Sequence, residues 1–324
     1  MMFDKILKAF PPPKFLDIPF AGIALSDSSV RCIQFGKKDG GLFIEKYTEK
    51  PVPSGVIVSG QINNKDAIVE ILRDLKKDLS LCYVKMSLPE EKGYLFTAKI
   101  PMVKPEEVRT AIESKIEENV PVSPAELLFD YKLVDRNRTD RLDVAVSALP
   151  INVIDTYVQI AGLAGLSLLS LEIESQAIIR SLTRRGDKST ILIVNFGPGK
   201  VGLYVSSGRV VHFTSTISTK GQSSRGEEFL LQEINKLYVY WHTLKENVDK
   251  PERKIGRIII CGEKFSDTTT SYLSSNNQTE AVLGNVWINA FDTAIVTPEI
   301  SFDDSLKYAA AIGLALPMDI LIRD

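Results

Sequence analysis

Two segments of the chain have the composition of turns that bind phosphate. The first, residues 23–35, passes from an apolar stretch through a serine-rich turn into a second apolar stretch. The second, residues 191–205, does the same through a turn with two glycines, about 170 residues later. Each segment predicts a buried strand, a tight turn and a strand that returns beside the first. Two such hairpins can enclose a phosphate chain from opposite sides, so the pair predicts a two-lobed architecture that binds ATP. The candidate binding residues in these turns are Ser26, Ser28, Ser29, Asn195, Gly197 and Gly199.

The residue types in both turns suit contacts with phosphate oxygens. The serines can donate hydroxyl and backbone N–H groups, and the glycines allow the backbone to approach a ligand closely. Pro198, between the two glycines, lacks the N–H group that such a turn would otherwise offer. A strand rather than a helix is expected after this turn, so the spacing does not match the dinucleotide-binding pattern.

The composition excludes several classes of protein. The 324 residues are 44% hydrophobic and 25% charged, which is ordinary for a globular chain of about two domains. The formal net charge of −2 argues against general binding to nucleic acid. No apolar run reaches the roughly 20 residues that cross a bilayer, and no secretory leader is recognisable, so we expect a cytoplasmic protein. The two histidines and three dispersed cysteines predict no metal site and buried, reduced thiols.

The chain divides into two similar halves around an insertion. Residues 1–19 predict a short amphipathic helix and a proline-rich linker. Three strands, a helix that begins after Asn64 and a fourth strand then follow, and the second half repeats this order, so we expect an internal duplication. A polar loop is expected at 273–279. The predicted domains are 20–88 with 166–186 as the first lobe, 89–165 as an inserted α/β subdomain, and 187–324 as the second lobe, with a smaller subdomain at about 218–254.

The order of these elements resembles the actin-like ATPase superfamily, and the insertion resembles its branch with the cell-division protein FtsA and the pilus protein PilM. The closer resemblance is to the PilM family of type IV pilus assembly proteins. Residues 22–31 stand where that family has its opening Gly-Ile-Asp-Ile-Gly-Ser-Ser-Ser-Val-Lys stretch. The resemblance covers residues 20–317. The other similar segments are 100–102, 106–108, 111–113, 120–122, 129–131, 143–148, 171–177 and 308–316.

The resemblance implies an α/β fold of two duplicated, ribonuclease H-like lobes with a nucleotide between them. It also implies that an aspartate in each hairpin serves magnesium-bound water, but Ala24 and Asn195 stand at these positions. Alanine accepts no hydrogen bond and asparagine carries no charge, so magnesium should bind weakly or not at all. Gly262 and Glu263 stand where the superfamily has a Gly-Gly turn beside the adenosine. ATP binding therefore stays open, while we expect no catalytic residue and little hydrolysis.

The resemblance further implies a scaffold on the cytoplasmic face of the inner membrane. PilM-like proteins take the N-terminal peptide of the membrane protein PilN in a groove beside the inserted subdomain, and strand addition is one way to bind such a peptide. Here residues 65–77, 95–100 and 106–119 would border that groove. Association with the membrane would run through partners, including other pilus assembly proteins. If the aromatic residues at 238–241 form an exposed patch, the chain could associate with itself as a homo-oligomer. The simpler interpretation is a core stripe of Leu230, Ile234, Leu237 and Trp241.

Two other functions are compatible with this fold. An active ATPase or a kinase-like enzyme would need the carboxylates that positions 24 and 195 lack, and a kinase would also need a carboxylate base. An FtsA-like cell-division protein would need an amphipathic membrane helix after a linker, whereas this sequence ends shortly after its last predicted helix. A pilus assembly scaffold is therefore the preferred interpretation.

Overall fold

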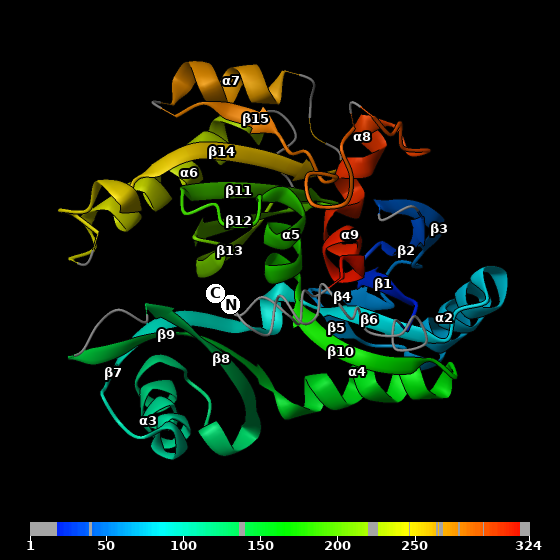
Figure 1. Cartoon of the computed structure of the whole chain (residues 1–324), viewed down its shortest axis with the longest axis horizontal. Helices are drawn as coiled ribbons and strands as arrows, with labels where there is room; N and C mark the ends of the chain where they lie inside the picture. The colour runs from blue at the N-terminus through cyan, green and yellow to red at the C-terminus, as the bar shows by residue number, and fades with distance from the viewer. Residues whose placement is uncertain are drawn as a thin grey trace, which may run out of the picture.

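The computed structural model describes residues 18–38, 41–135, 140–219, 226–245, 247–263, 265, 268–277, 279–293 and 295–317. Two five-stranded sheets form two lobes, and a three-stranded sheet forms a module beside the first lobe (Figure 1). The helix and linker predicted at 1–19 lie almost wholly outside the described residues.

The first lobe is built on a mixed sheet. In sheet order its strands are β10 (Ser167–Ile173), β6 (Tyr83–Leu88), β1 (Phe20–Leu25), β2 (Ser29–Lys38) and β3 (Gly41–Pro51). The β1, β2 and β3 strands are antiparallel, whereas β6 runs parallel to β1, and β10 runs parallel to β6. A small hairpin of β4 (Ile57–Val58) and β5 (Gln61–Ile62) leads into helix α2 (Lys65–Leu79).

Helix α2 forms where local signals predict it. The side chain of Asn64 accepts a hydrogen bond from the backbone N–H of Ala67 at 3.1 Å and so caps the first turn. Ile68 and Leu72 are completely buried in the core of the first lobe. The helix ends at Ser80, which takes a left-handed conformation with φ of 50°.

The second lobe repeats the first. In sheet order its strands are β13 (Val210–Ser218), β12 (Lys200–Ser207), β11 (Thr190–Gly197), β14 (Ile255–Gly262) and β15 (Ala281–Leu283). Three strands are again antiparallel, and two further strands again run parallel to the first. The predicted duplication is therefore confirmed. Helix α6 (Gly226–Thr243) packs on this sheet through the core stripe of Leu230, Ile234, Leu237 and Trp241.

The prediction of a polar loop at 273–279 is wrong. Helix α7 (Thr269–Asn276) covers most of that segment, and Leu273 is fully buried in the core of the second lobe. The hydroxyl of Ser274 accepts a hydrogen bond from the backbone N–H of Ala281 at 3.0 Å, which fixes the helix along β15.

The insertion has a core of its own. Its antiparallel strands are, in sheet order, β7 (Tyr94–Pro101), β9 (Arg141–Pro150) and β8 (Leu127–Asp135), and α3 (Val108–Asn119) packs on one face. Helix α4 (Ile151–Leu163) follows β9 directly and leads back to the first lobe. Tyr157 and Ile160 on α4 are buried in the core of the first lobe, so this helix joins the two modules.

Two short helices cross between the lobes. Helix α5 (Glu174–Leu182) and helix α9 (Ala309–Ala315) lie side by side at the centre of the molecule (Figure 1). Helix α9 follows helix α8 (Phe302–Ser305) and the 3₁₀ turn η6 (Leu306–Tyr308). A Cβ atom on Gly313 would lie 1.8 Å from the carbonyl oxygen of Ala177, so only glycine allows this close approach.

The structure bears on two expectations from composition, which concern membrane-spanning segments and the state of the cysteines. Among them, no helix is long and apolar enough to span a membrane. Cys32 and Cys261 are buried free thiols as expected, but Cys82 is exposed. Cys82 precedes β6 in an irregular segment, so its apolar neighbours in sequence do not enclose it.

Candidate functional site

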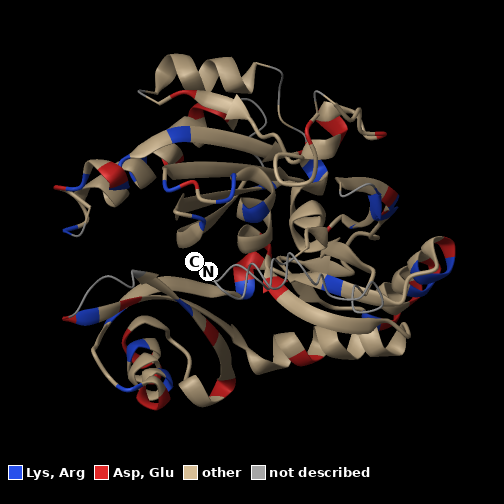
Figure 2. Ribbon diagram, in the orientation of Figure 1, with Lys and Arg blue, Asp and Glu red and all other residues tan. Residues whose placement is uncertain are grey.

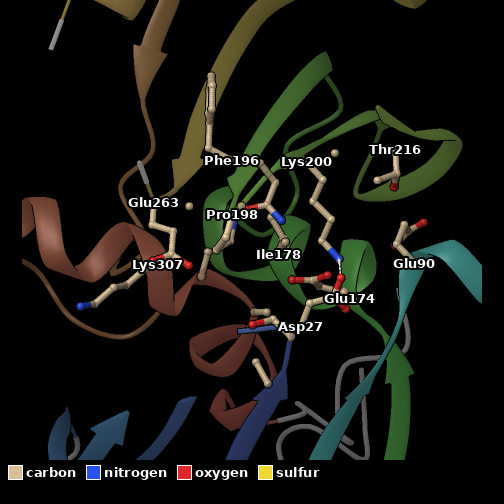
Figure 3. Close-up of a pocket in the computed structure, with 18 of the residues that line it drawn as sticks. Asp27, Glu90, Glu174, Ile178, Phe196, Pro198, Lys200, Thr216, Glu263 and Lys307 are labelled. Carbon is tan, nitrogen blue, oxygen red and sulfur yellow. Dashed lines mark ion pairs between the residues drawn. The ribbon is translucent and has the colours of Figure 1, made fainter. Parts of the chain in front are cut away.

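Five of the eight candidate residues line a cavity in the cleft between the two lobes (Figure 3). The cavity there measures about 50 Å³, whereas pockets for small molecules begin at roughly 300 Å³. In this conformation the cleft is therefore nearly filled by side chains. Of the predicted residues, Ser28, Ser29 and Gly199 do not line the cavity. Those that do are Ser26, Asn195, Gly197, Gly262 and Glu263.

The serine-rich turn uses its own hydrogen-bond donors internally. The Ser26 hydroxyl oxygen accepts hydrogen bonds from the backbone N–H groups of Ser29 at 3.1 Å and Ser28 at 3.4 Å. The Ser26 hydroxyl also lies 3.1 Å from the carbonyl oxygen of Ser29, to which it donates. A serine that bonds its own turn in this way competes with any external acceptor. A phosphate would therefore have to displace Ser26 before it could reach these amides.

The glycine-containing turn shows a similar internal closure. Gly199 has φ of 74°, which suits a tight turn between β11 and β12. Asn195 lies under the turn, where its amide nitrogen is 3.4 Å from the Tyr204 hydroxyl and its amide oxygen accepts from the Cys261 thiol at 3.5 Å. The Tyr204 hydroxyl would clash with any side chain on Gly202. The space beneath this turn is thus occupied by Tyr204.

The third predicted element is the turn at Gly262 and Glu263, and the packing of strands requires its glycine. Gly262 has φ of 94°, and a Cβ atom there would lie 2.0 Å from the carbonyl oxygen of Phe196. The following residue, Glu263, donates its backbone N–H to that same oxygen at 2.9 Å. The close approach of β14 to β11 is enough to explain why glycine stands at position 262, and no ligand is needed for the explanation.

Charged side chains connect the two lobes across the cleft. From the second lobe, Lys200 forms ion pairs with Glu91 and, at 3.6 Å, with Asp27 of the first lobe. From the first lobe, Arg31 pairs with Glu263 of the second lobe at 2.7 Å and with Glu49 at 2.8 Å. Figure 3 shows Lys200 reaching from β12 toward Asp27 and Glu174. These pairs hold the lobes together at the place where a nucleotide was predicted.

Two carboxyl groups in the cleft, the buried Glu90 and the half-buried Glu174, hold protons near neutral pH. Burial raises the pKa of Glu90 to about 7, although the backbone N–H of Ser175 donates to its Oε2 at 3.0 Å. Burial also raises the pKa of Glu174 to about 7, and the charge of Lys200 opposes this only in part. Burial alone would lower the pKa of Lys200, but Glu91, Glu174 and Asp27 together raise it. Lys200 is therefore charged while Glu90 and Glu174 are partly neutral at pH 7.

The residues of the cleft do not fit magnesium. Ala24 and Asn195 supply no carboxylate at the two positions that the resemblance implies. The ammonium group of Lys200 occupies the space beside Asp27 and Glu91, where it would repel a divalent cation. Within the described part of the chain, no group of three or more His, Cys, Asp and Glu residues could hold a metal ion.

Most of the charged residues of this cleft were not predicted as site residues. Asp27 and Lys200 lie inside the two hairpins, so their position next to the predicted turns is a signal that sequence reasoning could have used. Glu90 and Glu91 follow β6 in the short 3₁₀ turn η2 (Glu90–Lys92), and nothing in their local sequence indicates that they face the second lobe. Their partners become evident only when the two lobes are assembled.

A second candidate site lies where the insertion joins the first lobe. We call it the α4 surface and define it as Leu128, Ile151, Val158 and Leu163, all of which are exposed. Leu128 pairs in register with Leu149 near the end of β9, two residues before Ile151. Asp155 is the only charged residue in α4, and Figure 2 shows this helix as an almost uncharged ribbon. Ile151 and Val158 share one side of the helix with Asp155, whereas Leu163 lies on another side. Exposed apolar side chains gathered in this way mark a site of interaction.

The segments predicted to border a peptide groove are placed on both sides of this junction. Residues 65–77 lie on α2, residues 95–100 on the edge strand β7, and residues 106–119 on η3 (Pro105–Glu107) and α3. The exposed positions of α2 and α3 are mostly charged. The exposed apolar side chains of this region lie instead on α4, β8 and β10 and at Met102, which follows β7.

Comparison with known proteins places the chain among pilus assembly proteins. A family model described as type IV pilus assembly protein PilM matches residues 22–246. The structure is similar to that of a protein in a PilM-PilN type IV pilus biogenesis complex, with a TM-score of 0.79 and 15% identity over 92% of this chain and 98% of that chain. It is also similar to the ethanolamine utilization protein EutJ from Carboxydothermus hydrogenoformans, with a TM-score of 0.52 and 13% identity over 94% of this chain and 90% of that chain.

The two kinds of match carry different conclusions. At these low identities the structural similarities establish the fold alone, and that fold is the expected actin-like, two-lobed α/β architecture. The family model covers more than half of the chain, including both hairpins and the whole insertion. The chain therefore belongs to the PilM family of type IV pilus assembly proteins.

Proposed function

We propose that this protein is a cytoplasmic scaffold of type IV pilus assembly that binds the N-terminal peptide of a PilN-like inner-membrane protein. Membership of the PilM family supports the assembly role. The α4 surface is the observation that carries the peptide site, because it is apolar, solvent-exposed and adjacent to the insertion. Through that partner, and through other pilus assembly proteins, the scaffold would lie at the inner face of the membrane.

The geometry of the α4 surface suits a short apolar peptide. Ile151 and Val158 are seven residues apart and lie on the same side of the helix, two turns from each other. Leu128 extends this row onto β8 beside the start of the helix. A peptide with apolar side chains at matching intervals would bury these residues, and each fully buried aliphatic side chain contributes about 1.5–3 kcal/mol. Asp155 is exposed on this same side of the helix, between Ile151 and Val158, so a bound peptide must leave its carboxylate hydrated or supply a partner for it.

A single charge should disrupt this binding. Val158, 49% exposed, can be replaced in Val158→Asp without altering the core of the first lobe. We expect the affinity for the peptide to fall at least about tenfold, because an aspartate on an apolar interface must be desolvated without a partner. The measurement is fluorescence anisotropy with a labelled N-terminal peptide of the PilN-like protein.

The matched control is Val239→Asp in the second lobe. Val239 lies on α6 and is 65% exposed, so the two variants add the same charge to the exposed side of a helix. The control should bind the peptide as the unmodified protein does. Equal affinities of both variants and the unmodified protein would reject the α4 surface as the peptide site.

Nucleotide is expected to have little effect on this protein, and magnesium none. The cleft lacks carboxylates at positions 24 and 195, and its lysine is already paired with two acidic residues. We expect ATP with magnesium to raise the melting temperature no more than ATP alone, with no release of phosphate above the buffer rate. Sulfate at equal ionic strength controls for salt. A magnesium-dependent rise of several degrees would contradict this expectation, because ligand at about 100 times its Kd adds about 2.7 kcal/mol of stability.

A further inference from the structure

The charges across the cleft are divided unequally between the two lobes. Asp27 follows β1, Glu91 lies in η2, and Glu174 begins α5, so all three carboxyl groups belong to the first lobe or its connecting helix. The cation that they face, Lys200, is the first residue of β12 in the second lobe. We call these four residues the Lys200 cluster. The attraction within this cluster therefore acts between the lobes rather than within either one.

The first lobe holds its part of the cluster in place independently of Lys200. Both carboxylate oxygens of Asp27 accept backbone hydrogen bonds, from Ser59 at 3.0 Å and from Gly60 at 3.1 Å. Glu174 is half-buried at the N-terminal end of α5, where the helix dipole favours a negative charge. The carboxyl groups are thus already positioned, and Lys200 completes the arrangement when the lobes approach.

A second cross-cleft pair lies on the other side of the cavity. Arg31 of β2 bonds Glu263 at the end of β14, and it also donates to the carbonyl oxygen of Lys307 at 3.3 Å. The Lys307 ammonium group in turn pairs with Glu49 of β3 at 2.9 Å. The small cavity is therefore bounded on two sides by ion pairs that join the lobes.

We propose that Lys200 is a tethered counter-ion that favours the closed arrangement of the two lobes. The ammonium group neutralises the carboxylates of the first lobe from a fixed position in the second lobe. This ion pair therefore contributes to closure together with the Arg31–Glu263 pair. The proposal does not depend on the peptide site, because none of the residues in the Lys200 cluster belongs to the α4 surface.

Removing the ammonium group should open the cleft. In Lys200→Met the apolar stem is retained and the charge is lost, which leaves Asp27 and Glu91 without their cation. We expect backbone amides at 25–31, 90–93 and 197–202 to exchange hydrogen about tenfold faster than in the unmodified protein, measured by mass spectrometry. The amides of β6 and β14 serve as an internal standard and should keep their protection, which shows that the lobes remain folded.

The matched control is Lys50→Met. Lys50 pairs with Asp78 at 2.5 Å, and both residues lie in the first lobe, so this variant removes an ion pair that does not cross the cleft. Exchange at the cleft segments should not change. If Lys200→Met leaves those segments as protected as in the unmodified protein, or if Lys50→Met exposes them equally, the proposal is wrong.

Salt provides a readout that loss of packing would not reproduce. Ion pairs with partial exposure weaken as ionic strength rises, because the screening length shortens from about 10 Å at 0.1 M to about 3 Å at 1 M. Cleft exchange in the unmodified protein should therefore accelerate with sodium chloride, whereas exchange in Lys200→Met should accelerate less, because only the Arg31 and Lys307 ion pairs remain there to be screened. Glu91→Gln removes the charge of the nearer partner of Lys200. The salt dependence of its cleft exchange should lie between those of the unmodified protein and Lys200→Met. Equal salt dependence in all three proteins would overturn the electrostatic explanation.

Discussion

Replacing Gly313 by alanine should lower the free energy of unfolding by about 3 kcal/mol. The added Cβ atom would lie 1.8 Å from the carbonyl oxygen of Ala177 and 2.5 Å from its carbonyl carbon. Both contacts are with backbone, so relief requires α5 and α9 to move apart rather than a side chain to rotate. These two helices connect the lobes, and the variant should therefore also loosen the cleft.

The control for this effect is the same substitution in a helix without a close neighbour. A Cβ atom on Gly162 of α4 would meet nothing within 4 Å. Gly162→Ala should raise stability by up to about 1 kcal/mol, because alanine favours the helical backbone more than glycine does. Urea denaturation followed by circular dichroism measures both variants. A finding that Gly313→Ala is as stable as Gly162→Ala would show that the helices accommodate the methyl group.

The elements that local chemistry determines were predictable from the sequence. Asn64 caps α2 as expected, because a short polar side chain before an amphipathic stretch has few other roles. The two hairpins and the strands beside them were evident from apolar runs interrupted by small residues. Because both halves contain the same order of elements, the fold could be inferred even though few residues are repeated.

Helix α7 shows where such local signals fail. Its eight residues are mostly serine, threonine and asparagine, which usually favour turns, and a single leucine faces the core. Thr269 is buried as well, but it is polar, so the segment shows no apolar periodicity to detect. The helix is stabilised by packing on β15, which lies later in the chain, so its formation depends on tertiary contacts.

Five of the eight predicted site residues line the cleft, and their contact with a nucleotide stays a prediction. Gly262 and Asn195 lie in the cleft as expected, but the geometry gives them roles in strand packing and in a bond to Tyr204. Ser26 bonds its own turn, a behaviour typical of serine that the sequence could have suggested. The pairing of Lys200 with Asp27 and Glu91 links residues that are more than a hundred positions apart, and no local pattern indicates it.

A second large effect is expected from Glu90→Gln, and it should depend on pH. Glu90 is buried, and within the described part of the chain its Oε1 atom has no hydrogen-bond partner. Burial raises its pKa from 4.5 to about 7. Below about pH 4.5 the carboxyl is protonated in both the folded and the unfolded chain, so it carries no penalty there. As pH rises from about 4.5 to about 7 the unfolded chain releases this proton while the folded chain retains it, so the folded state loses stability over this range and no further stability above it.

Glutamine does not titrate, so the variant should avoid that loss. A difference of one pKa unit corresponds to about 1.4 kcal/mol, and an unpaired amide group costs about 1 kcal/mol in return. We therefore expect the free energy of unfolding of Glu90→Gln to exceed that of the unmodified protein by about 2 kcal/mol at about pH 8.5. At about pH 5 the two free energies should be equal. Urea denaturation at both pH values measures the difference, with Glu106→Gln as an exposed control on the insertion. Glu174 remains in every protein compared, so its own pH dependence largely cancels. If the difference between Glu90→Gln and the unmodified protein is the same at both pH values, the buried carboxyl is ionised throughout, and the cleft must contain a compensating interaction with Glu90.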